Sequence, residues 1–507
     1  MSTSKSFLNY AYIMKLAKYL TAVVASSLLL TSCGEDFFND MDSSTATSDQ
    51  IENEGKNDPQ KVLASQLNGC YTNWNLFIPD GVSELNAHME CGFGGIMTMA
   101  DVMSNNHSHP LGTGDPFRYD RVLDYNAQQY IRAGWYWSFF YTIIKAANDV
   151  VSVIDEANAT PTQKQYLGQA LAFRGISYAY LAQYYQMTYK GNEDKLCVPI
   201  LLSSKESDQE VKGRATVANV YERATTDLEK AVQCLQGFKH GNDKTTIDES
   251  VAEGLLARVY LVMNEWDKAA AMAHAARQGY ELNDINLAQT WNYQDANNQE
   301  VMWAFIPTDA NKRYYASWAS FNSYDGPGYG HMYPHVMDQA LYNSIPDADV
   351  RKKFFVKPEE ATDTYPALMC KKFPYVAQWL GNVVYMRVSE MYLIEAEAQL
   401  MAGNSQACAD IMAEFMPNRV EGWTAPSAYT QMSIYKQRRI ELYDEGFGYT
   451  DCLRLKQDLV RDYEGSNEAA ALKVNIPHTS YKWIFQVPQN EIRDNDAISE
   501  ADQNPLQ

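Results

Sequence analysis

The 507-residue sequence has few of the residues and motifs on which common enzymes and nucleic-acid-binding proteins depend. It contains 8 histidines, and it has no glycine-rich phosphate loop, no nucleophile elbow and no zinc-protease helix. Positive charge is also scarce, because 42 Lys and Arg face 63 Asp and Glu and leave a net charge of −21. A surface this acidic repels phosphate backbones, so we expect no nucleic-acid partner.

Paired cysteines are missing as well. Seven cysteines follow Cys33, an odd number without the spacing of a disulfide framework. We therefore expect several of them to pack as small hydrophobic side chains. Beyond the N-terminal segment, no apolar run is long enough to cross a membrane.

The N-terminal segment carries a secretion signal. Lys15 and Lys18 precede a short apolar stretch that ends in Leu30-Thr31-Ser32-Cys33. A cysteine after small residues resembles the bacterial lipobox, in which the thiol receives a diacylglycerol. We predict that residues 1–32 are a lipoprotein signal peptide and that Cys33 is the lipid attachment site. Met14 is the expected true start of the protein, because a signal that begins there has the ordinary length. An ordinary signal peptide that happens to contain a cysteine is the alternative.

The residues after Cys33 indicate a tether followed by a helical body. Residues 33–60 are rich in Asp, Ser, Thr, Asn and Gly and are predicted to be flexible. Helical periodicity then dominates 61–284 and 386–507, and the pair 250–263 and 266–278 resembles a tetratricopeptide hairpin. Four further predictions are made in this body: a loop over 92–115, helices over 385–402 and 429–456, and a strand and turn over 483–492.

The region 285–385 differs, because Asn, Gly, Pro, Tyr and Trp replace the helical pattern apart from a short strand at 300–306. The whole chain holds 35 Tyr and 10 Trp, more than a core needs, and flat rings suit the C–H faces of sugars. Loops on helical scaffolds commonly carry function. The alternative is that these rings fill gaps in the core. We expect a ligand site, with Trp318 first, formed by Trp318, Tyr324, Asn322, Asp325, Tyr314 and Tyr315, and with Trp74, Asn105, Asn106 and His107 as second candidates.

Several motifs, in order, resemble one family. They are Arg174–Tyr180, Arg214–Tyr221 with Asp227-Leu228, Arg387–Ala398, Ile434–Gly446 with Asp451–Arg454, and Val487–Ile492. Together they resemble the SusD/RagB family of surface glycan-binding lipoproteins of Bacteroidetes. The sequence departs from that pattern at 448–450, where the family has an aromatic pair before Asp451.

The resemblance implies a mostly helical SusD-like fold, with tetratricopeptide-like pairs and an irregular ligand-binding half. It implies no catalysis and no cofactor, and an oligosaccharide ligand (peptide in some members). The implied partner is a SusC-like TonB-dependent transporter, with the lipoprotein anchored in the outer membrane and facing the cell exterior. Glu35 and Asp36 resemble the signal that directs lipoproteins of this phylum to that face.

Two other interpretations stay open for the charged residues and the histidines. Glu390, Glu395, Arg438, Arg439, Glu441 and Glu445 fit interhelical salt bridges, although a glycosidase would also need two carboxylates. His88-x-x-Cys91 and His107-Ser-His109 each lack recognisable further metal ligands, so we expect no metal. A surface hydrolase and a peptide-binding adaptor are therefore the alternatives to a glycan-binding protein.

Overall fold

The protein is described by a computed structural model that covers residues 59–79, 88–111, 114–203 and 213–506. The chain divides into two units, residues 1–62 and 63–507. Met14, Cys33 and all but the last two residues of the predicted tether lie outside the described residues. Nearly all the described residues belong to the second unit.

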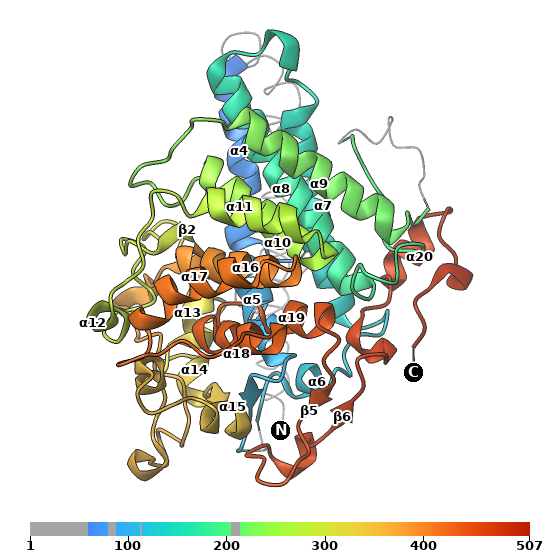
Figure 1. Cartoon of the computed structure of the whole chain (residues 1–507). Coiled ribbons are helices and arrows are strands. Elements are labelled where there is room, and N and C mark those ends of the chain that lie inside the picture. Colours follow the sequence, from blue (N-terminus) through green and yellow to red (C-terminus); the bar gives the residue numbers. More distant parts are fainter. Residues whose placement is uncertain (1–58, 80–87, 112–113, 204–212, 507) are drawn as a thin grey trace, which may run out of the picture. The chain divides into compact units, whose positions relative to one another are not determined.

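The second unit is mostly helical, which confirms the predicted fold class (Figure 1). Its longer helices are α4 (Pro59–Leu76, beginning in the first unit), α5 (Gly92–Val102), α7 (Ile131–Val151), α8 (Pro161–Tyr185), α9 (Val217–Cys234), α10 (Glu249–Met263), α11 (Trp266–Ala276), α16 (Val388–Met401), α17 (Ser405–Phe415), α18 (Gln431–Glu441) and α19 (Gly448–Arg454). The short helices are α6 (Arg118–Arg121), α12 (Ile285–Ala288), α13 (Trp318–Asn322), α14 (Tyr329–Met332), α15 (Gln339–Asn343) and α20 (Gln489–Asp494).

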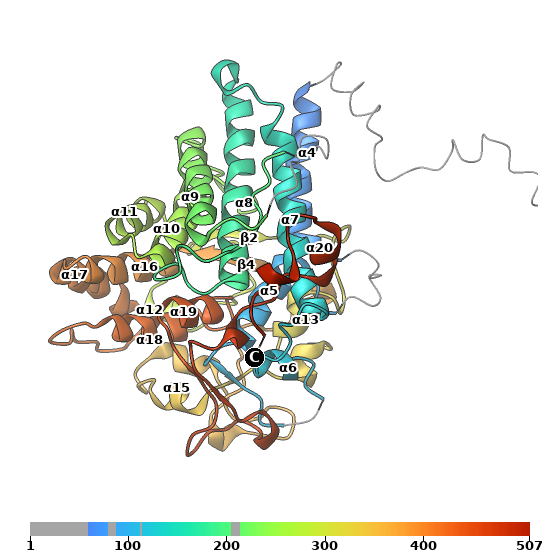
Figure 2. The ribbon, with the colours of Figure 1, turned by 90° about the vertical axis from the view of Figure 1, so that its right-hand side faces the viewer.

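The N-terminal helices form a layer of neighbouring helices, and Figure 2 shows α4, α7 and α8 running side by side. Trp74 of α4 joins them, because its ring centroid lies 5.9 Å from that of Phe139 in α7 and 5.6 Å from that of Phe173 in α8. Side-chain caps fix where these helices start: Thr160 makes a capping box with Gln163 at α8, and Thr216 accepts a hydrogen bond from the Asn219 N–H at α9.

The tetratricopeptide-like pair is present as α10 and α11. Asn264 ends α10 in the left-handed conformation, with φ of 62°, which lets the chain reverse within two residues. The alanines Ala269, Ala270 and Ala273 of α11 are buried, so the two helices approach closely.

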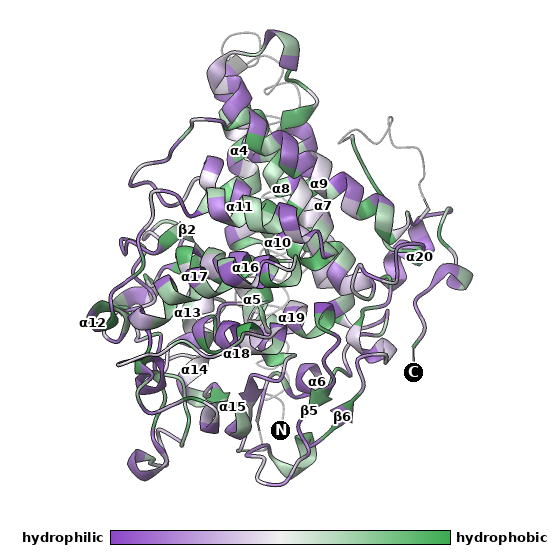
Figure 3. Ribbon diagram, viewed as in Figure 1, coloured by the Kyte–Doolittle hydropathy of each residue, from purple (hydrophilic) through white to green (hydrophobic). Residues whose placement is uncertain are grey.

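The loop predicted over 92–115 is wrong for its first part, because Gly92–Val102 forms helix α5. All its residues are buried, and Figure 3 places it among the more hydrophobic segments. A Cβ at Gly94 would lie 2.8 Å from the Cβ of Trp318, and one at Gly95 would lie 2.1 Å from the Met89 carbonyl oxygen. Glycine has a low helix propensity, and this misled the prediction. In α5 the glycines allow close packing, which outweighs their low propensity.

Three C-terminal predictions need correction. The segment 385–402 begins as strand β4 (Val383–Arg387) before α16 starts at Val388. The helix predicted over 429–456 is broken between α18 and α19 by a turn in which Asp444 and Gly446 have φ of 60° and 88°. The segment 483–492 forms no strand; it ends in the short helix α20, which begins after Pro488, a residue suited to the start of a helix.

Strands are few among the described residues, and each pairs with one antiparallel partner. The pairs are β1 (His107–Ser108) with β3 (Val336–Met337), β2 (Val301–Phe305) with β4 (Val383–Arg387), and β5 (Leu459–Val460) with β6 (Asn475–Ile476). The strand predicted at 300–306 is thus confirmed as β2.

A buried network of ion pairs connects the region 285–385 to the C-terminal helices. Arg387 contacts Glu300, Glu441 and Glu445 at 2.6, 3.0 and 2.6 Å, and its side chain is fully buried. Arg419 contacts Glu300 and Glu441 at 2.6 and 2.9 Å. Burial opposes the charge on Glu441, yet the surrounding arginines hold its pKa well below its usual range. Glu441 therefore stays ionised, and the ion pairs connect β2, β4 and α18 to one another.

Candidate functional site

Five aromatic side chains of the region 285–385 lie together, and we call them the tyrosine surface: Tyr314, Tyr315, Tyr329, Tyr375 and Trp379. Tyr314 and Tyr315 are 60% and 54% exposed, so they present ring faces to solvent. The Tyr315 ring centroid lies 5.8 Å from that of Tyr329 and 6.1 Å from that of Trp379. Tyr375 meets Trp379 edge to face at 5.0 Å. The exposed rings thus rest on a partly buried aromatic base.

Polar groups surround these rings. The Tyr329 hydroxyl lies 2.7 Å from Nδ1 of His88. Lys312 donates to Gln378 at 3.3 Å and also lies 5.9 Å from the Tyr314 ring centroid. Burial raises the pKa of Tyr329, so its phenol stays protonated near neutral pH. Flat rings beside hydrogen-bonding groups can hold a polar ligand that also has an apolar face.

The backbone beneath the tyrosine surface is strained. Gln378 and Trp379 both have φ of 62°, the left-handed region that residues other than glycine seldom adopt. Such outliers persist only where surrounding contacts enforce them, and they concentrate at functional sites. The contacts come from two glycines, because a Cβ at Gly326 would lie 2.8 Å from Tyr375 and one at Gly328 would lie 2.7 Å from Trp379.

The six first candidates for the ligand site in the region 285–385 fall into two groups. Tyr314 and Tyr315 belong to the tyrosine surface. Tyr324 is half-buried, and its ring centroid lies 6.4 Å from that of Tyr365. Asp325 is exposed and accepts a hydrogen bond from the Tyr375 N–H at 2.6 Å, so it also borders this surface.

Trp318 and Asn322 form the second group, and both side chains are buried. Trp318 is only 3% exposed, and its ring meets Phe373 edge to face at 4.7 Å. Asn322 is buried and donates to the Thr98 hydroxyl and to the Trp318 carbonyl, each at 2.9 Å. Helix α13 turns both side chains toward α5, where the small Gly94 leaves room for the indole. A ring without an open face cannot stack on a sugar.

The second candidates are also largely buried. Trp74 lies in the core and stacks on Phe93 at 4.2 Å. Asn106 accepts a hydrogen bond from Arg439 at 2.8 Å, and Asn105 donates to the Asp458 carbonyl at 2.8 Å. His107 is buried beside His335 and Asp444. None of the four contacts a member of the tyrosine surface in the described residues.

Tyr329, Tyr375 and Trp379 were missed by the sequence-based prediction. The available signal was weak, because Tyr375 and Trp379 stand about 50 residues after the glycines that they contact, Gly326 and Gly328, and tertiary contacts bring the two segments together.

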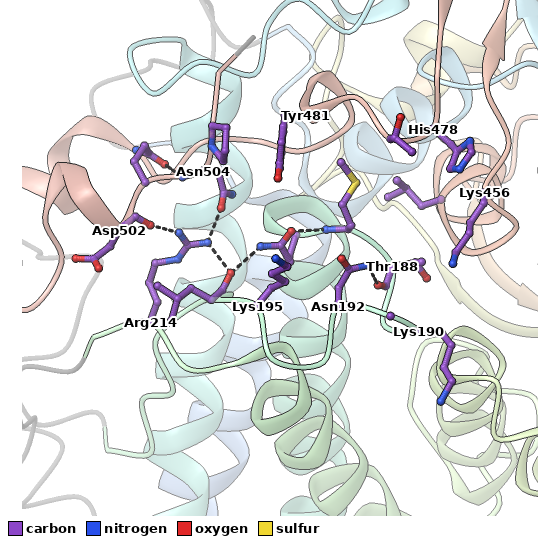
Figure 4. A pocket seen from close by; sticks show the side chains of 18 of the residues that line it. Thr188, Lys190, Asn192, Lys195, Arg214, Lys456, His478, Tyr481, Asp502 and Asn504 are labelled. Carbon is purple, nitrogen blue, oxygen red and sulfur yellow. Dashed lines mark hydrogen bonds between the residues drawn. The ribbon is translucent and has the colours of Figure 1, made fainter.

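A second feature is a hollow of about 440 Å³, shown in Figure 4, which we call the basic hollow. Lys190, Lys195, Lys456 and Arg214 line it, and Asp502 is the one acid among its lining residues. Arg214 donates to the Asn504 side chain at 2.7 Å and to the Cys197 and Leu196 carbonyls at 2.6 and 2.9 Å. These partners are uncharged, so the hollow concentrates positive charge in an acidic protein. Five stretches of the chain build it (186–196, 214, 453–456, 478–481 and 501–505), which is why no sequence motif indicated it.

The charged residues of the C-terminal motifs serve the fold, as one of the two interpretations predicted. Glu390 of α16 pairs with Arg258 of α10 at 2.7 Å, so this ion pair joins two helices. The other pairs are Glu395 with Arg277, Arg438 with Asp451, Glu441 with Arg419, and Glu445 with Arg387. Arg439 donates to Asn106 and to the Asn105 carbonyl instead. Each of these carboxylates is thus held by a cation.

Family models match most of the chain. A model described as starch-binding and associating with the outer membrane matches residues 100–261, and the model of the SusD family matches residues 260–506. No curated protein sequence matches the chain. None of the helices in the described residues combines the length and apolar character needed to span a membrane.

Solved structures show the same fold. A SusD-like carbohydrate binding protein from Bacteroides vulgatus is 23% identical and has a TM-score of 0.75, with 88% of this chain and 98% of that chain covered. A SusD superfamily protein from Bacteroides thetaiotaomicron is 23% identical, with a TM-score of 0.71 and coverage of 88% and 99%. The surface glycan-binding protein A from Bacteroides uniformis is 19% identical, with a TM-score of 0.67 and coverage of 88% and 99%.

Proposed function

Since this chain belongs to the SusD/RagB family, we propose that it is a cell-surface protein that binds oligosaccharides through its tyrosine surface. The observation that carries the proposal is the pair of exposed rings, Tyr314 and Tyr315, set on a strained aromatic base with polar groups at its edges. The structural neighbour from Bacteroides uniformis is a surface glycan-binding protein, which supports the same ligand class.

Both ring stacking and hydrogen bonding contribute to sugar binding at this surface. The rings of Tyr314 and Tyr315 pack on the C–H face of a sugar, each contributing about 0.5–1.5 kcal/mol by analogy with aromatic pairs. Asp325, Gln378 and His88 offer acceptors and donors to the sugar hydroxyls. Tyr324 contributes from the neighbouring part of the loop. Affinity at such a site is modest, because few contacts are fully desolvated.

The proposed cellular role is delivery of the bound oligosaccharide to a SusC-like TonB-dependent transporter. A lipid on Cys33 would hold the protein in the outer membrane, facing the cell exterior, with the residues that follow as a tether. Support for this part comes from the sequence motifs and from the family description that names the outer membrane. A SusC-like gene adjacent to the gene for this protein, and co-purification of the two products, would test it.

Two alternatives make different predictions. A peptide-binding protein of the same fold would bind peptides and ignore sugars. A surface hydrolase would need a free pair of carboxylates, whereas the motif carboxylates are each paired with a cation.

The direct test is a glycan array on the chain, followed by calorimetry with the strongest ligand. We expect Tyr314→Ala/Tyr315→Ala to weaken binding at least about tenfold, which corresponds to about 1.4 kcal/mol. The matched control is Tyr119→Ala/Tyr130→Ala, which removes two other exposed tyrosines that are 50% and 38% exposed. Equal loss of affinity in both variants, or an array without any bound glycan, would reject the proposed site.

A further inference from the structure

Three polar side chains from distant parts of the chain meet in the core. They are His107 of β1, His335 just before β3, and Asp444 in the turn between α18 and α19. The Asp444 Oδ1 lies 2.6 Å from the His107 Nε2 and 3.1 Å from the His335 Nδ1. One ligand atom from each residue lies within 4.8 Å of the other two. Pairing of β1 with β3, in which His107 is opposite Met337, brings the two histidines together.

Hydrogen bonds inside the protein leave this cluster only partly satisfied. The side chains of His107, His335 and Asp444 are 0%, 4% and 1% exposed. Both ring nitrogens of His107, the His335 Nε2 and the Asp444 Oδ2 lack a hydrogen bond. The short distance from His107 to Asp444 therefore does not have hydrogen-bond geometry. Buried polar atoms without partners destabilise a fold, so four of them in one cluster need an explanation.

The chemistry of the three groups is that of a transition-metal site. Two imidazoles and one carboxylate are ligands that Zn²⁺ binds at about 2.0–2.2 Å. A neutral imidazole has a lone pair to offer to such an ion. Asp444 takes the left-handed conformation, with φ of 60°, which turns its carboxylate toward both histidines at a backbone cost.

The surroundings hold the ligands in place. The His107 ring stacks on Tyr443 with centroids 4.9 Å apart, and the His335 ring lies 6.4 Å from that of Phe117. The Cys370 N–H donates to the His335 carbonyl at 2.8 Å, which holds the backbone of that ligand. A tetrahedral ion bound by three residues has one more position to fill.

We propose that His107, His335 and Asp444 form a structural binding site for a divalent transition metal ion of the zinc type. The ion would cross-link β1, β3 and the turn after α18, and would satisfy the polar atoms that the protein leaves without partners. Motif inspection could not find this site, because its ligands stand at positions 107, 335 and 444 and share no local spacing. The proposal is independent of glycan binding.

The test measures metal content in the full chain, produced in medium supplemented with Zn²⁺ and dialysed against metal-free buffer. We expect about one zinc ion per chain by mass spectrometry, as for a structural site with protein ligands. His335→Gln and Asp444→Asn keep the side-chain volume and should each reduce the bound zinc to less than about a tenth. His478→Gln is the control, because His478 is 39% exposed and pairs with Asp458 away from the cluster.

Further measurements distinguish the loss of the metal site from misfolding of a variant. Circular dichroism confirms that each variant remains helical, and a chelator should lower the melting temperature of the wild-type chain but not that of Asp444→Asn. Cobalt substitution should give the visible absorption of a low-coordinate site. A folded wild-type chain that holds no zinc, cobalt, nickel, manganese or iron, and whose melting temperature does not change with the chelator, would overturn the proposal and leave a buried polar cluster without a metal.

Discussion

At the scale of single residues, Trp318 and Tyr315 show that residue type alone does not decide exposure. They stand three positions apart in the same aromatic-rich stretch, yet Trp318 is 3% exposed and Tyr315 is 54% exposed. The difference arises from α13, which directs Trp318 toward the glycines of α5. The two residues therefore give opposite predictions for substitution.

Trp318→Ala is expected to destabilise the fold. Removing a buried indole loses its transfer free energy and leaves a cavity, which together cost about 3–5 kcal/mol of the free energy of unfolding. Chemical denaturation monitored by circular dichroism measures this cost. Tyr314→Ala, on an exposed side chain, should change the free energy of unfolding by less than about 0.5 kcal/mol. Similar stabilities for the two variants would contradict the burial described for Trp318.

Tyr315→Phe and Tyr315→Ala separate stacking from hydrogen bonding. If the ring face holds the sugar, Tyr315→Phe keeps most of the affinity, while Tyr315→Ala loses about 0.5–1.5 kcal/mol. Calorimetry with the ligand found on the array measures both. A loss in Tyr315→Phe as large as in Tyr315→Ala would assign the interaction to the hydroxyl instead.

At the scale of elements, the sequence predicted the helix ends and turns that depend on neighbouring residues. Two helices start at Thr160 and Thr216, and the chain reverses at Asn264. Residues next to each position determine these features, so the local sequence can indicate them. Helix α5 and strand β4 depend on distant partners, because α5 packs against Trp318 and β4 pairs with β2. The same reason hid Tyr375 and Trp379 from the predicted site. Sequence spacing carries no record of such long-range contacts.

Helix α10 provides a prediction on pH, through Glu253. Burial, followed by the nearby Glu249 carboxylate, raises the pKa of Glu253 to about 7. In the unfolded chain the pKa is about 4.3, so the folded state holds this proton more tightly. The contribution to stability is thus fully present below about pH 4.3 and is lost as the pH rises through 7.

Glu253→Gln removes this dependence. We expect the variant to be more stable than the wild type at pH 8 by about 1 kcal/mol, after allowance for solvent screening, and to lose this advantage near pH 4. Denaturation curves at the two pH values measure the difference. The exposed Glu464→Gln is the control, and an equal response in both variants would refute the role of Glu253.

At the scale of the whole second unit, the buried ion pairs around Arg387 connect segments that the chain separates widely. Arg387→Met leaves Glu300, Glu441 and Glu445 without this partner in the core. Breaking a buried pair in this way costs about 3–5 kcal/mol. Thermal unfolding measures the loss. Arg493→Ala is the control, because the Arg493–Asp494 pair is 72% and 60% exposed and surface pairs contribute about 0–1 kcal/mol.

Cys33→Ser tests the lipid anchor proposed for the whole molecule. If Cys33 carries the lipid, the variant should lose labelled palmitate and leave the outer-membrane fraction. Cys70→Ser, at a buried cysteine of the body, is the control and should keep both the label and the location. Continued labelling of Cys33→Ser would place the lipid elsewhere.

Asn504 at the basic hollow has a consequence for the order in which the protein is made. Its side chain donates to the carbonyls of Tyr185 and Phe485, at 2.7 and 2.8 Å, and accepts from Arg214. Tyr185 and Arg214 are therefore synthesised some 300 residues before the partner that joins them. Until residue 504 leaves the ribosome, the N-terminal helices lack the hydrogen bonds that Asn504 makes with them. This part of the fold therefore closes only near the end of synthesis, after all the helices from α4 to α20 have been made.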